Sequence, residues 1–192
     1  MSTPTESKTI SVSTGESIFI YDNFFPSNEQ YYFETLANEV KYGPIFNYIN
    51  RPEYFFLGCK FNKNDIDNIR LLDSPSFQKI SQFIENKSIV RAWILANTSS
   101  SKYEYHTDWN NNQDFITLTY YINTVWDKNW GGETLFCNNY GNVELAIEYK
   151  PNRLIIFPSK LLHKPSIHSY WGIRYSLSLV FSPQQEFKFK DV

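Results

Sequence analysis

The chain has 192 residues, with 18 Lys and Arg against 20 Asp and Glu, a formal net charge of -2 and a sequence pI near 5.9. This length allows one domain with a sizeable core, and the absence of a basic excess disfavours non-specific binding to nucleic acid. The two cysteines, Cys59 and Cys137, are too few for a disulfide framework or a four-thiolate zinc site, and they fit a reducing compartment.

Charged residues are spread along the chain, so no run of about 18 apolar residues forms, and the polar N-terminus has no secretory pattern. We therefore expect a cytoplasmic location and no membrane partner. Together with the charge balance, this leaves a peptide, a protein or a small molecule as the expected partner, rather than nucleic acid. The oligomeric state is left open.

Residues 1–16 are rich in Ser and Thr and are expected to form a flexible leader. One domain is expected over residues 17–192. Its first part, residues 17–87, is predicted to hold a strand and two helices that support a β core over residues 88–183.

Two amphipathic helices are predicted in the first part of the domain. Ser27 is expected to be the N-cap of the first helix, in a capping box with Gln30, and the helix is expected to end at Gly43. The second helix is expected to begin at Pro75, directly after Ser74, because proline is favoured at the first helical position.

From residue 88 onward the pattern changes to short segments rich in β-branched and aromatic residues, separated by Asn- and Gly-containing turns. The expected strands cover residues 88–98, 102–108, 115–123, 133–137, 143–149, 152–157 and 174–181. An aromatic content of 18% also favours a β-rich core. Strands at this spacing predict an antiparallel barrel or a double-sheet jelly roll, with the two helices covering one outer face.

Only three histidines occur, His106, His163 and His168, so a metal site that uses imidazole must draw on them. His106 and Asp108 lie two residues apart on a predicted strand, and the period of two along a strand points both side chains to one side of the sheet. They could provide two ligands of a 2-His-1-carboxylate site, which binds iron(II) and keeps open positions. A hydrogen-bonded pair at the end of a strand is the alternative.

The third ligand must come from a later strand, and His163 fits because it follows the apolar run 154–157 and a short bend. The alternative is His168, which lies only six residues before Arg174. We expect His168 to have a surface or substrate-facing role instead.

Arg174, Ser176 and Ser178 alternate with apolar residues, so one face of this strand presents a guanidinium and two hydroxyls to the side of the predicted metal. An interior arginine requires a carboxylate partner, and a dicarboxylate cosubstrate would offer a bidentate one. A structural ion pair is the alternative role for Arg174.

Several ordered stretches resemble the prolyl 4-hydroxylase branch of the 2-oxoglutarate/iron(II) dioxygenase superfamily. They are residues 102–108, 119–123, 130–136 and 149–158, His163, and residues 172–178, all within roughly residues 88–183. The resemblance implies a mainly β fold with supporting helices around a double-stranded β-helix, or jelly-roll, core.

The resemblance also implies the roles of individual residues. It implies that the catalytic iron is bound by His106, Asp108 and His163. It implies that 2-oxoglutarate is bound by Arg174, Tyr103, Tyr121 and Ser176. Tyr103 is out of phase with His106, so its role needs a bend in the strand. Tyr121 could alternatively be one of many packed tyrosines. Trp109 and His168 are the substrate-side candidates, and an aromatic that stabilises its loop is the alternative for Trp109.

The implied activity is the decarboxylation of 2-oxoglutarate to succinate coupled to hydroxylation of an aliphatic carbon, with Fe(2+) and O2 required and a need for ascorbate left open. The expected substrate is a prolyl residue in a peptide or protein. The alternatives are a free amino acid or small metabolite, or a non-catalytic cupin-like binding barrel. Val180 stands where the nucleobase dealkylases of this superfamily have a second arginine, which disfavours that activity.

Overall fold

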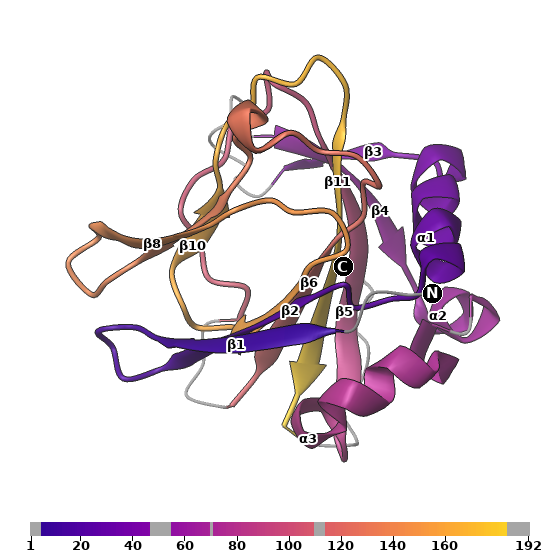
Figure 1. The fold of residues 1–192 in the computed structure, drawn as a ribbon, viewed down its shortest axis with the longest axis horizontal. Helices are drawn as coiled ribbons and strands as arrows, with labels where there is room; N and C mark the ends of the chain where they lie inside the picture. Colours follow the sequence, from indigo (N-terminus) through magenta and orange to yellow (C-terminus); the bar gives the residue numbers. More distant parts are fainter. Residues whose placement is uncertain (1–4, 47–54, 70, 110–113, 184–192) are drawn as a thin grey trace.

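The computed structural model describes residues 5–46, 55–69, 71–109 and 114–183, which form two antiparallel sheets with helices on one side (Figure 1). The larger sheet has the strand order β1-β2-β9-β6-β11-β5-β4-β3, and the smaller sheet has the order β10-β7-β8. The strands are β1 (Glu6–Ser11), β2 (Ser17–Asp22), β3 (Gly43–Phe46), β4 (Phe55–Phe61), β5 (Ser88–Asn97), β6 (Ile116–Tyr121), β7 (Thr134–Cys137), β8 (Val143–Ile147), β9 (Leu154–Pro158), β10 (His163–Pro165) and β11 (Arg174–Ser182).

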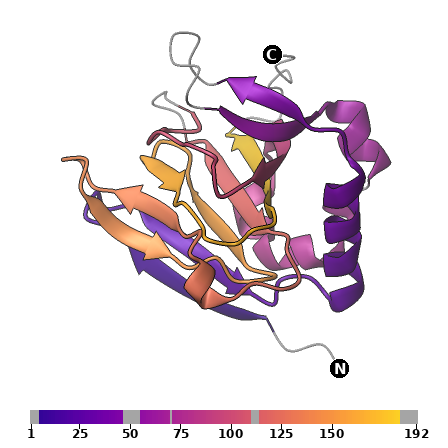
Figure 2. The ribbon, with the colours of Figure 1, turned by 90° about the horizontal axis from the view of Figure 1, so that it is seen from above.

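The helices lie on one side of the larger sheet, and the smaller sheet lies on the other (Figure 2). The helices are α1 (Ser27–Glu39), α2 (Lys63–Asn68) and α3 (Ser81–Ile84), with 3-10 turns at Leu71–Asp73, Pro75–Ile80 and Lys128–Trp130. This is the predicted arrangement, a mainly β jelly roll with helices that cover one outer face. No helix within the described residues is long and apolar enough to cross a membrane.

Strand β11 lies at the centre of the larger sheet, between β6 and β5, and all of its residues are buried. The period of two divides it into two faces. Tyr175, Leu177, Leu179 and Phe181 join the apolar core beneath the helices. Arg174, Ser176 and Ser178 face the space between the two sheets, where they line a cavity. The predicted alternation is thus confirmed.

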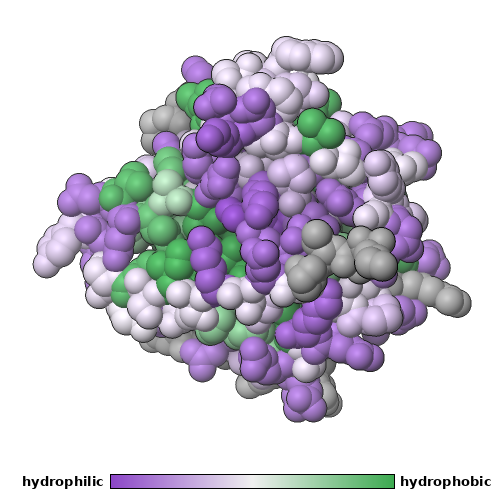
Figure 3. Space-filling model, viewed as in Figure 1, coloured by the Kyte–Doolittle hydropathy of each residue, from purple (hydrophilic) through white to green (hydrophobic). Residues whose placement is uncertain are grey.

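The second apolar core lies between the sheets and includes Ile18, Phe136, Tyr149 and Phe157. Apolar side chains are visible between β8 and β1 in Figure 3, within a largely hydrophilic surface. The turn after β1 contacts the smaller sheet there, because the hydroxyl of Ser13 donates to Glu144 at 2.8 Å. This contact holds the outer strands of the two sheets together at that edge.

The N-terminal residues differ from the expected leader. Glu6–Ser11 forms β1 and pairs with β2 along its whole length, from Glu6 opposite Asp22 to Ser11 opposite Ser17. The Ser and Thr residues of this segment are polar enough to resemble a leader, yet they suit the exposed edge strand of a sheet. The polarity reflected exposure rather than absence of structure.

The predicted capping box of α1 does not form. The N-cap is Pro26, which is extended and makes no side-chain cap, so Ser27 is already the first helical residue. The helix ends at Glu39, where Val40 turns to extended backbone, and Gly43 begins β3 instead. The second predicted helix does begin at Pro75 after Ser74, but its first turns are 3-10.

Residues 102–108 were expected to form a strand, and they do not. Among them, only His106 pairs with another segment as an isolated bridge, opposite His163. Four further elements were not anticipated from the sequence: β3, β4, α2 and β10.

Candidate metal centre and its cavity

A cavity of about 250 Å³ lies between the two sheets. One wall is formed by the alternate residues of β5, and another by Arg174, Ser176 and Ser178 of β11. The β5 residues are Arg91, Trp93, Leu95 and Asn97, and the remaining lining residues are Phe56, Tyr103, His106, Thr107, Asp108, Thr119, Thr134, His163 and Pro165. Its size suits a small organic acid beside a metal ion.

His106, Asp108 and His163 meet at this cavity, and their ligand atoms all lie within 4.8 Å of one another. The backbone brings the histidines together: each N–H donates to the other residue's carbonyl at 2.9 Å. Asp108 is fixed beside them because its N–H donates to the carbonyl of Ser159 at 2.9 Å. Its carboxylate oxygens then lie 3.5 Å from His163 Nε2 and 4.0 Å from His106 Nε2.

Both imidazoles have the orientation that a metal ligand needs. Nδ1 of His106 lies 3.0 Å from the carbonyl of Glu104, and Nδ1 of His163 lies 2.8 Å from the carbonyl of Leu161. Nδ1–H donation to a carbonyl leaves the Nε2 lone pair free to bind a metal. Burial lowers the pKa of His163 to about 4, so this ring is neutral at pH 7 and its Nε2 can act as a ligand.

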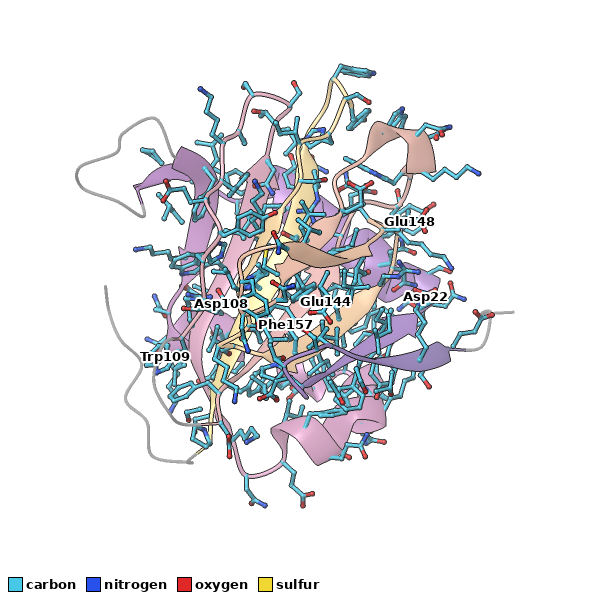
Figure 4. The ribbon with its side chains drawn as sticks, turned by 90° about the vertical axis from the view of Figure 1, so that its left-hand side faces the viewer. Asp22, Asp108, Trp109, Glu144, Glu148 and Phe157 are labelled. Atoms are coloured by element: carbon cyan, nitrogen blue, oxygen red, sulfur yellow. The ribbon has the colours of Figure 1, made fainter. Side chains whose placement is uncertain are left out.

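Asp108 lies toward the middle of the molecule (Figure 4), and its carboxylate is contacted from two sides. Thr117 Oγ1 donates to Oδ2 at 2.8 Å, and the guanidinium of Arg91 forms an ion pair with Oδ1. Burial opposes ionisation of this carboxyl, but the guanidinium of Arg91 and the hydrogen bond from Thr117 outweigh it and hold its pKa well below the usual range. Two imidazoles and one carboxylate are a donor set that fits iron(II).

Arg174 is 2% exposed, and within the described residues it forms no ion pair. Its Nε donates to the carbonyl of Gly132 at 2.9 Å, and its guanidinium lies over the rings of Tyr149 and Tyr121 at 4.5 and 5.2 Å. These contacts hold the side chain but do not neutralise it. A buried cation that lines a cavity is a site for an anion, and the planar fork suits a carboxylate.

The other predicted cosubstrate residues lie around Arg174 but differ in exposure to the cavity. Ser176 and Tyr103 line the cavity, and the hydroxyl of Tyr103 donates to Asn97. Tyr121 is fully buried behind Arg174, where its hydroxyl lies 2.7 Å from Thr134 Oγ1 and its ring stacks on Tyr149 at 4.4 Å. Tyr121 therefore packs against Arg174 and does not line the cavity, which agrees with the alternative of a packed tyrosine.

Neither substrate-side candidate is among the residues that line this cavity. Trp109 stacks on Phe115, with ring centroids 4.5 Å apart, in a small apolar cluster outside the cavity. His168 is 3% exposed, so it does not have the expected surface position. Its Nε2 lies 3.0 Å from the carbonyl of Asn97, and its ring packs against Trp126.

Four residues of this site were missed from the sequence: Arg91, Asn97, Thr117 and Gly132. The sequence gives little signal for Arg91 and Asn97, because Trp93 and Leu95 lie on the same face of the predicted strand. Nothing in the sequence singled out the carbonyl of Gly132, since any residue carries one.

The 2OG-Fe(II) oxygenase superfamily profile matches residues 92–181, which include all three residues of the His–Asp–His group and Arg174. A search of curated proteins finds no significant match.

Solved structures share the fold at low identity. A prolyl-4-hydroxylase from Pseudomonas putida aligns with a TM-score of 0.65 at 14% identity, covering 86% of this chain and 91% of that one. A prolyl hydroxylase from Trichoplax adhaerens, in complex with a peptide fragment of the hypoxia inducible factor oxygen degradation domain, aligns with a TM-score of 0.63 at 20% identity. The alignment covers 86% of this chain and 83% of that one. HygX from Streptomyces hygroscopicus, with nickel, 2-oxoglutarate and hygromycin B bound, aligns with a TM-score of 0.65 at 8% identity. The alignment covers 90% of this chain and 84% of that one. Residues 92–181 are therefore similar to the 2OG-Fe(II) oxygenase superfamily, and the chain has the fold of the prolyl 4-hydroxylase-like structures.

Proposed function

We propose that this protein is an iron(II)- and 2-oxoglutarate-dependent hydroxylase in which His106, Asp108 and His163 hold the metal and Arg174 binds 2-oxoglutarate. The observation that carries the proposal is the presence, in one cavity, of a 2-His-1-carboxylate group and a buried arginine with no acidic partner among the described residues. Neither feature alone defines an activity. Together they match the two requirements of this chemistry, a metal with open positions and an anchor for a dicarboxylate.

Bound iron would supply the oxidation of an aliphatic carbon, driven by the decarboxylation of 2-oxoglutarate to succinate. The protein's own contribution is orientation. Arg174 pairs with the carboxylate remote from the metal, which directs the other end of the cosubstrate toward His106 and His163. The aromatic and apolar wall formed by Phe56, Trp93 and Leu95 excludes water from the space between them.

A prolyl residue in a peptide or protein is the substrate that we propose first. The fold similarity to two prolyl hydroxylases, one of them bound to a peptide, supports this choice. A small metabolite is the second candidate, since HygX, which has a similar fold, is bound to hygromycin B, and the cavity here measures only about 250 Å³. Ascorbate as an auxiliary reductant and a cytoplasmic location are parts of the same proposal.

The first test measures metal and cosubstrate binding separately. We expect the purified chain to bind Mn(II) and then 2-oxoglutarate by calorimetry. His106→Gln should lose Mn(II) binding, because one of three ligands is removed, whereas the matched control His168→Gln should keep it. Arg174→Met should keep Mn(II) binding and lose 2-oxoglutarate binding. If His106→Gln still bound metal and ligand like the wild type, a binding-only barrel would replace the oxygenase.

Turnover is tested with Fe(II), 2-oxoglutarate and ascorbate, with succinate measured by mass spectrometry. A panel of proline-containing peptides, free amino acids and small metabolites is then searched for a gain of one oxygen. Oxidation of a prolyl peptide supports the first substrate, and oxidation confined to free metabolites supports the second. No succinate above a metal-free control would contradict the enzyme assignment.

A further inference from the structure

Strand β1 forms an exposed edge of the larger sheet (Figure 1). It stands first in the strand order, and five of its six residues are exposed. A free edge presents unpaired backbone N–H and C=O groups, and proteins usually protect such an edge with a short strand, a proline, a bulge or a covering segment. Among the strands at the ends of the two sheets, β1 is the longest; it contains no proline and keeps a continuous register with β2. Its edge is therefore suited to pair with a further strand.

The turn after β1 shows which backbone groups of this strand face outward. The N–H of Val12 donates to the carbonyl of Glu16 at 2.9 Å, so Val12 bonds toward the β2 side of the hairpin. Residues that bond to a given neighbour alternate along an antiparallel strand, so the even-numbered residues of β1 bond toward β2. The N–H and C=O groups of the odd-numbered residues, including Ser7 and Thr9, therefore point away from the sheet.

The charges on β1 indicate what kind of strand can pair with it. Glu6 and Lys8 lie two residues apart, so their side chains leave the same face of the sheet. Both are exposed, and neither forms an ion pair among the residues that the structure describes. Opposite charges on facing residues of paired strands stabilise the pair, and like charges destabilise it. A suitable partner strand has a basic residue opposite Glu6 and an acidic residue opposite Lys8.

We propose that the protein forms a two-fold symmetric dimer in which β1 pairs antiparallel with β1 of a second copy, centred on Ser7. At this register Ser7 lies opposite the partner's Ser7, and Glu6 lies opposite the partner's Lys8. Thr9 lies opposite the partner's Thr5, so the outward backbone groups of the odd-numbered residues form the ladder. The hydroxyl-bearing side chains also face one another, as in favourable cross-strand pairs.

Other registers of the same pairing are less favourable. Centring on Glu6 places two carboxylates directly opposite each other, and centring on Lys8 does the same with two ammonium groups. Centring on Thr9 places Lys8 opposite Ile10 and Glu6 opposite Val12, which leaves both charges without a partner. Of the registers centred on residues 6–9, only the one centred on Ser7 pairs both charges.

This interface is separate from the cavity. Three strands, β2, β9 and β6, lie between β1 and β11 in the larger sheet. The dimer therefore goes beyond the proposed function and does not depend on it.

Sedimentation velocity on the full chain tests the dimer. A ladder of this length buries less surface than a standard interface of about 1,600 Å², so we expect a dissociation constant on the order of 10 µM. Concentrations well below and well above this value should give monomer and dimer, respectively. A wild type that stays monomeric throughout overturns the proposal.

Charge exchange tests the contacts. Glu6→Lys and Lys8→Glu should each weaken dimerisation by about 10- to 50-fold, because both attractive pairs become repulsive. The double variant should dimerise like the wild type, and an equimolar mixture of the two single variants should form a mixed dimer because their charges are opposite. Glu39→Lys is the matched control, since Glu39 is exposed at the end of α1, and it should dimerise normally. Single variants that dimerise like the wild type would assign the dimer to another surface.

Cross-linking tests the register. Two facing residues in a hydrogen-bonded pair have Cα atoms about 5.5 Å apart, which a disulfide can span. Ser7→Cys should therefore cross-link two copies under mild oxidation, whereas Thr9→Cys should not, because Thr9 faces the partner's Thr5. The wild type is oxidised in parallel to account for Cys59 and Cys137. If Thr9→Cys cross-linked as fast as Ser7→Cys, pairing centred on Ser7 would be excluded.

These results are independent of metal and 2-oxoglutarate binding. Glu6→Lys should bind Mn(II) like the wild type, because no residue of β1 lines the cavity. A monomeric wild type that binds Mn(II) and 2-oxoglutarate overturns the dimer and leaves the oxygenase proposal intact. A dimer of the proposed register that binds neither supports the interface and contradicts the proposed function.

Discussion

The carboxylate of Asp108 accepts from two different donors, and this determines which of its lone pairs remain available to a metal. Thr117 contacts one oxygen and Arg91 the other, yet an ionised carboxylate offers about four lone-pair positions. Both contacts can therefore persist while one oxygen binds a cation. The hydroxyl of Thr117 is itself fixed, because it lies 2.8 Å from Ser159 Oγ.

The contact from Thr117 leads to a prediction at this scale. Thr117→Val keeps the shape of the side chain but removes the donor, so Asp108 loses one of its two orienting contacts. We expect Mn(II) affinity to fall roughly 10-fold, the lower end of the range for loss of such a supporting contact. Calorimetry in the absence of 2-oxoglutarate measures this directly.

The matched control is Thr119→Val, two residues farther along the same face of β6. Thr119 lines the cavity but has no hydrogen bond to Asp108. Its substitution should leave Mn(II) affinity within error of the wild type. An equal loss in both variants would mean that the strand tolerates no valine here and that the contact to Asp108 is irrelevant.

The sequence was informative about single residues where the chemistry is rare. Three histidines and one short His-x-Asp spacing limited the possible ligands to a few residues, the family resemblance singled out His106, Asp108 and His163, and the structure brings these three together. The sequence was uninformative about Asn97, because this residue shares its face of the predicted strand with the apolar Trp93 and Leu95. Only the three-dimensional structure reveals that its amide nitrogen is buried without a partner.

At the scale of elements, the turn between the 3-10 helix at Lys128–Trp130 and β7 shapes the anion site. Gly131 and Gly132 both have positive φ, at 76° and 84°, and Gly132 passes so close to Arg174 that a Cβ would lie 3.2 Å from its Cδ. It would also lie 3.1 Å from the ring of Trp126. Glycine is needed here for both conformation and space.

Gly132→Ala should therefore displace Arg174 as well as strain the backbone. We expect 2-oxoglutarate affinity to fall roughly tenfold or more, the cost of one misplaced charge-assisted contact. Gly141→Ala is a matched control, because Gly141 has φ of 80° but no atom within 4 Å of the added Cβ. It should destabilise the chain by about 1 kcal/mol and leave ligand affinity unchanged. Thermal unfolding measures the backbone strain in both variants, and calorimetry measures their affinity for 2-oxoglutarate. If Gly132→Ala and Gly141→Ala bound 2-oxoglutarate equally well, a displacement of Arg174 by the added Cβ would be contradicted.

Elements were predicted well where one period held for a whole segment. The alternation along β11 gave both the buried face and the cavity face correctly. Residues 102–108 alternate too, but this segment runs along the cavity and bonds to β10 at one position only, so it forms no strand. The edge strand β1 escaped prediction because its exposed residues carry no apolar period.

At the scale of the whole molecule, one partly buried ion-pair group ties the N-terminal strands to the turn before β9. The carboxylate of Asp22, at the end of β2, accepts from Arg153 at 2.6 and 3.0 Å and from Lys150 at 2.9 Å. Burial works against ionisation of Asp22, but Arg153 and Lys150 outweigh it and lower its pKa. In Figure 4 this group lies away from Asp108, so it is separate from the metal centre.

A lowered pKa in the folded state means that Asp22 stabilises the protein above its unfolded pKa of about 4, and that this contribution is lost as pH falls below that value. We expect Asp22→Asn to lower the free energy of unfolding at pH 7 by about 1–3 kcal/mol. The difference from the wild type should shrink as the pH falls from about 4. Urea unfolding across this pH range measures it, with Asp67→Asn on the exposed side of α2 as the control. A constant difference at all pH values would exclude the ionic contribution.

The overall architecture could be predicted because aromatic-rich segments with alternating apolar and polar residues, joined by short turns, are compatible with few folds. The pairing of β2 with β9 and of β11 with β5 could not, because contacts between segments far apart in sequence depend on the packing of both sheets together. For the same reason the position of Arg91 next to Asp108 was invisible in the sequence.

The reciprocal backbone bond between His106 and His163 has a consequence for the energetics of metal uptake. The two imidazoles are already adjacent, with ring centroids 4.6 Å apart, although their residues belong to distant parts of the chain. The entropic cost of bringing the two imidazoles together is thus incurred during folding, so these ligands need little rearrangement when a cation binds. Metal affinity and the stability of this one bridge are therefore linked, and a change that loosens the bridge should weaken the centre without touching any ligand atom.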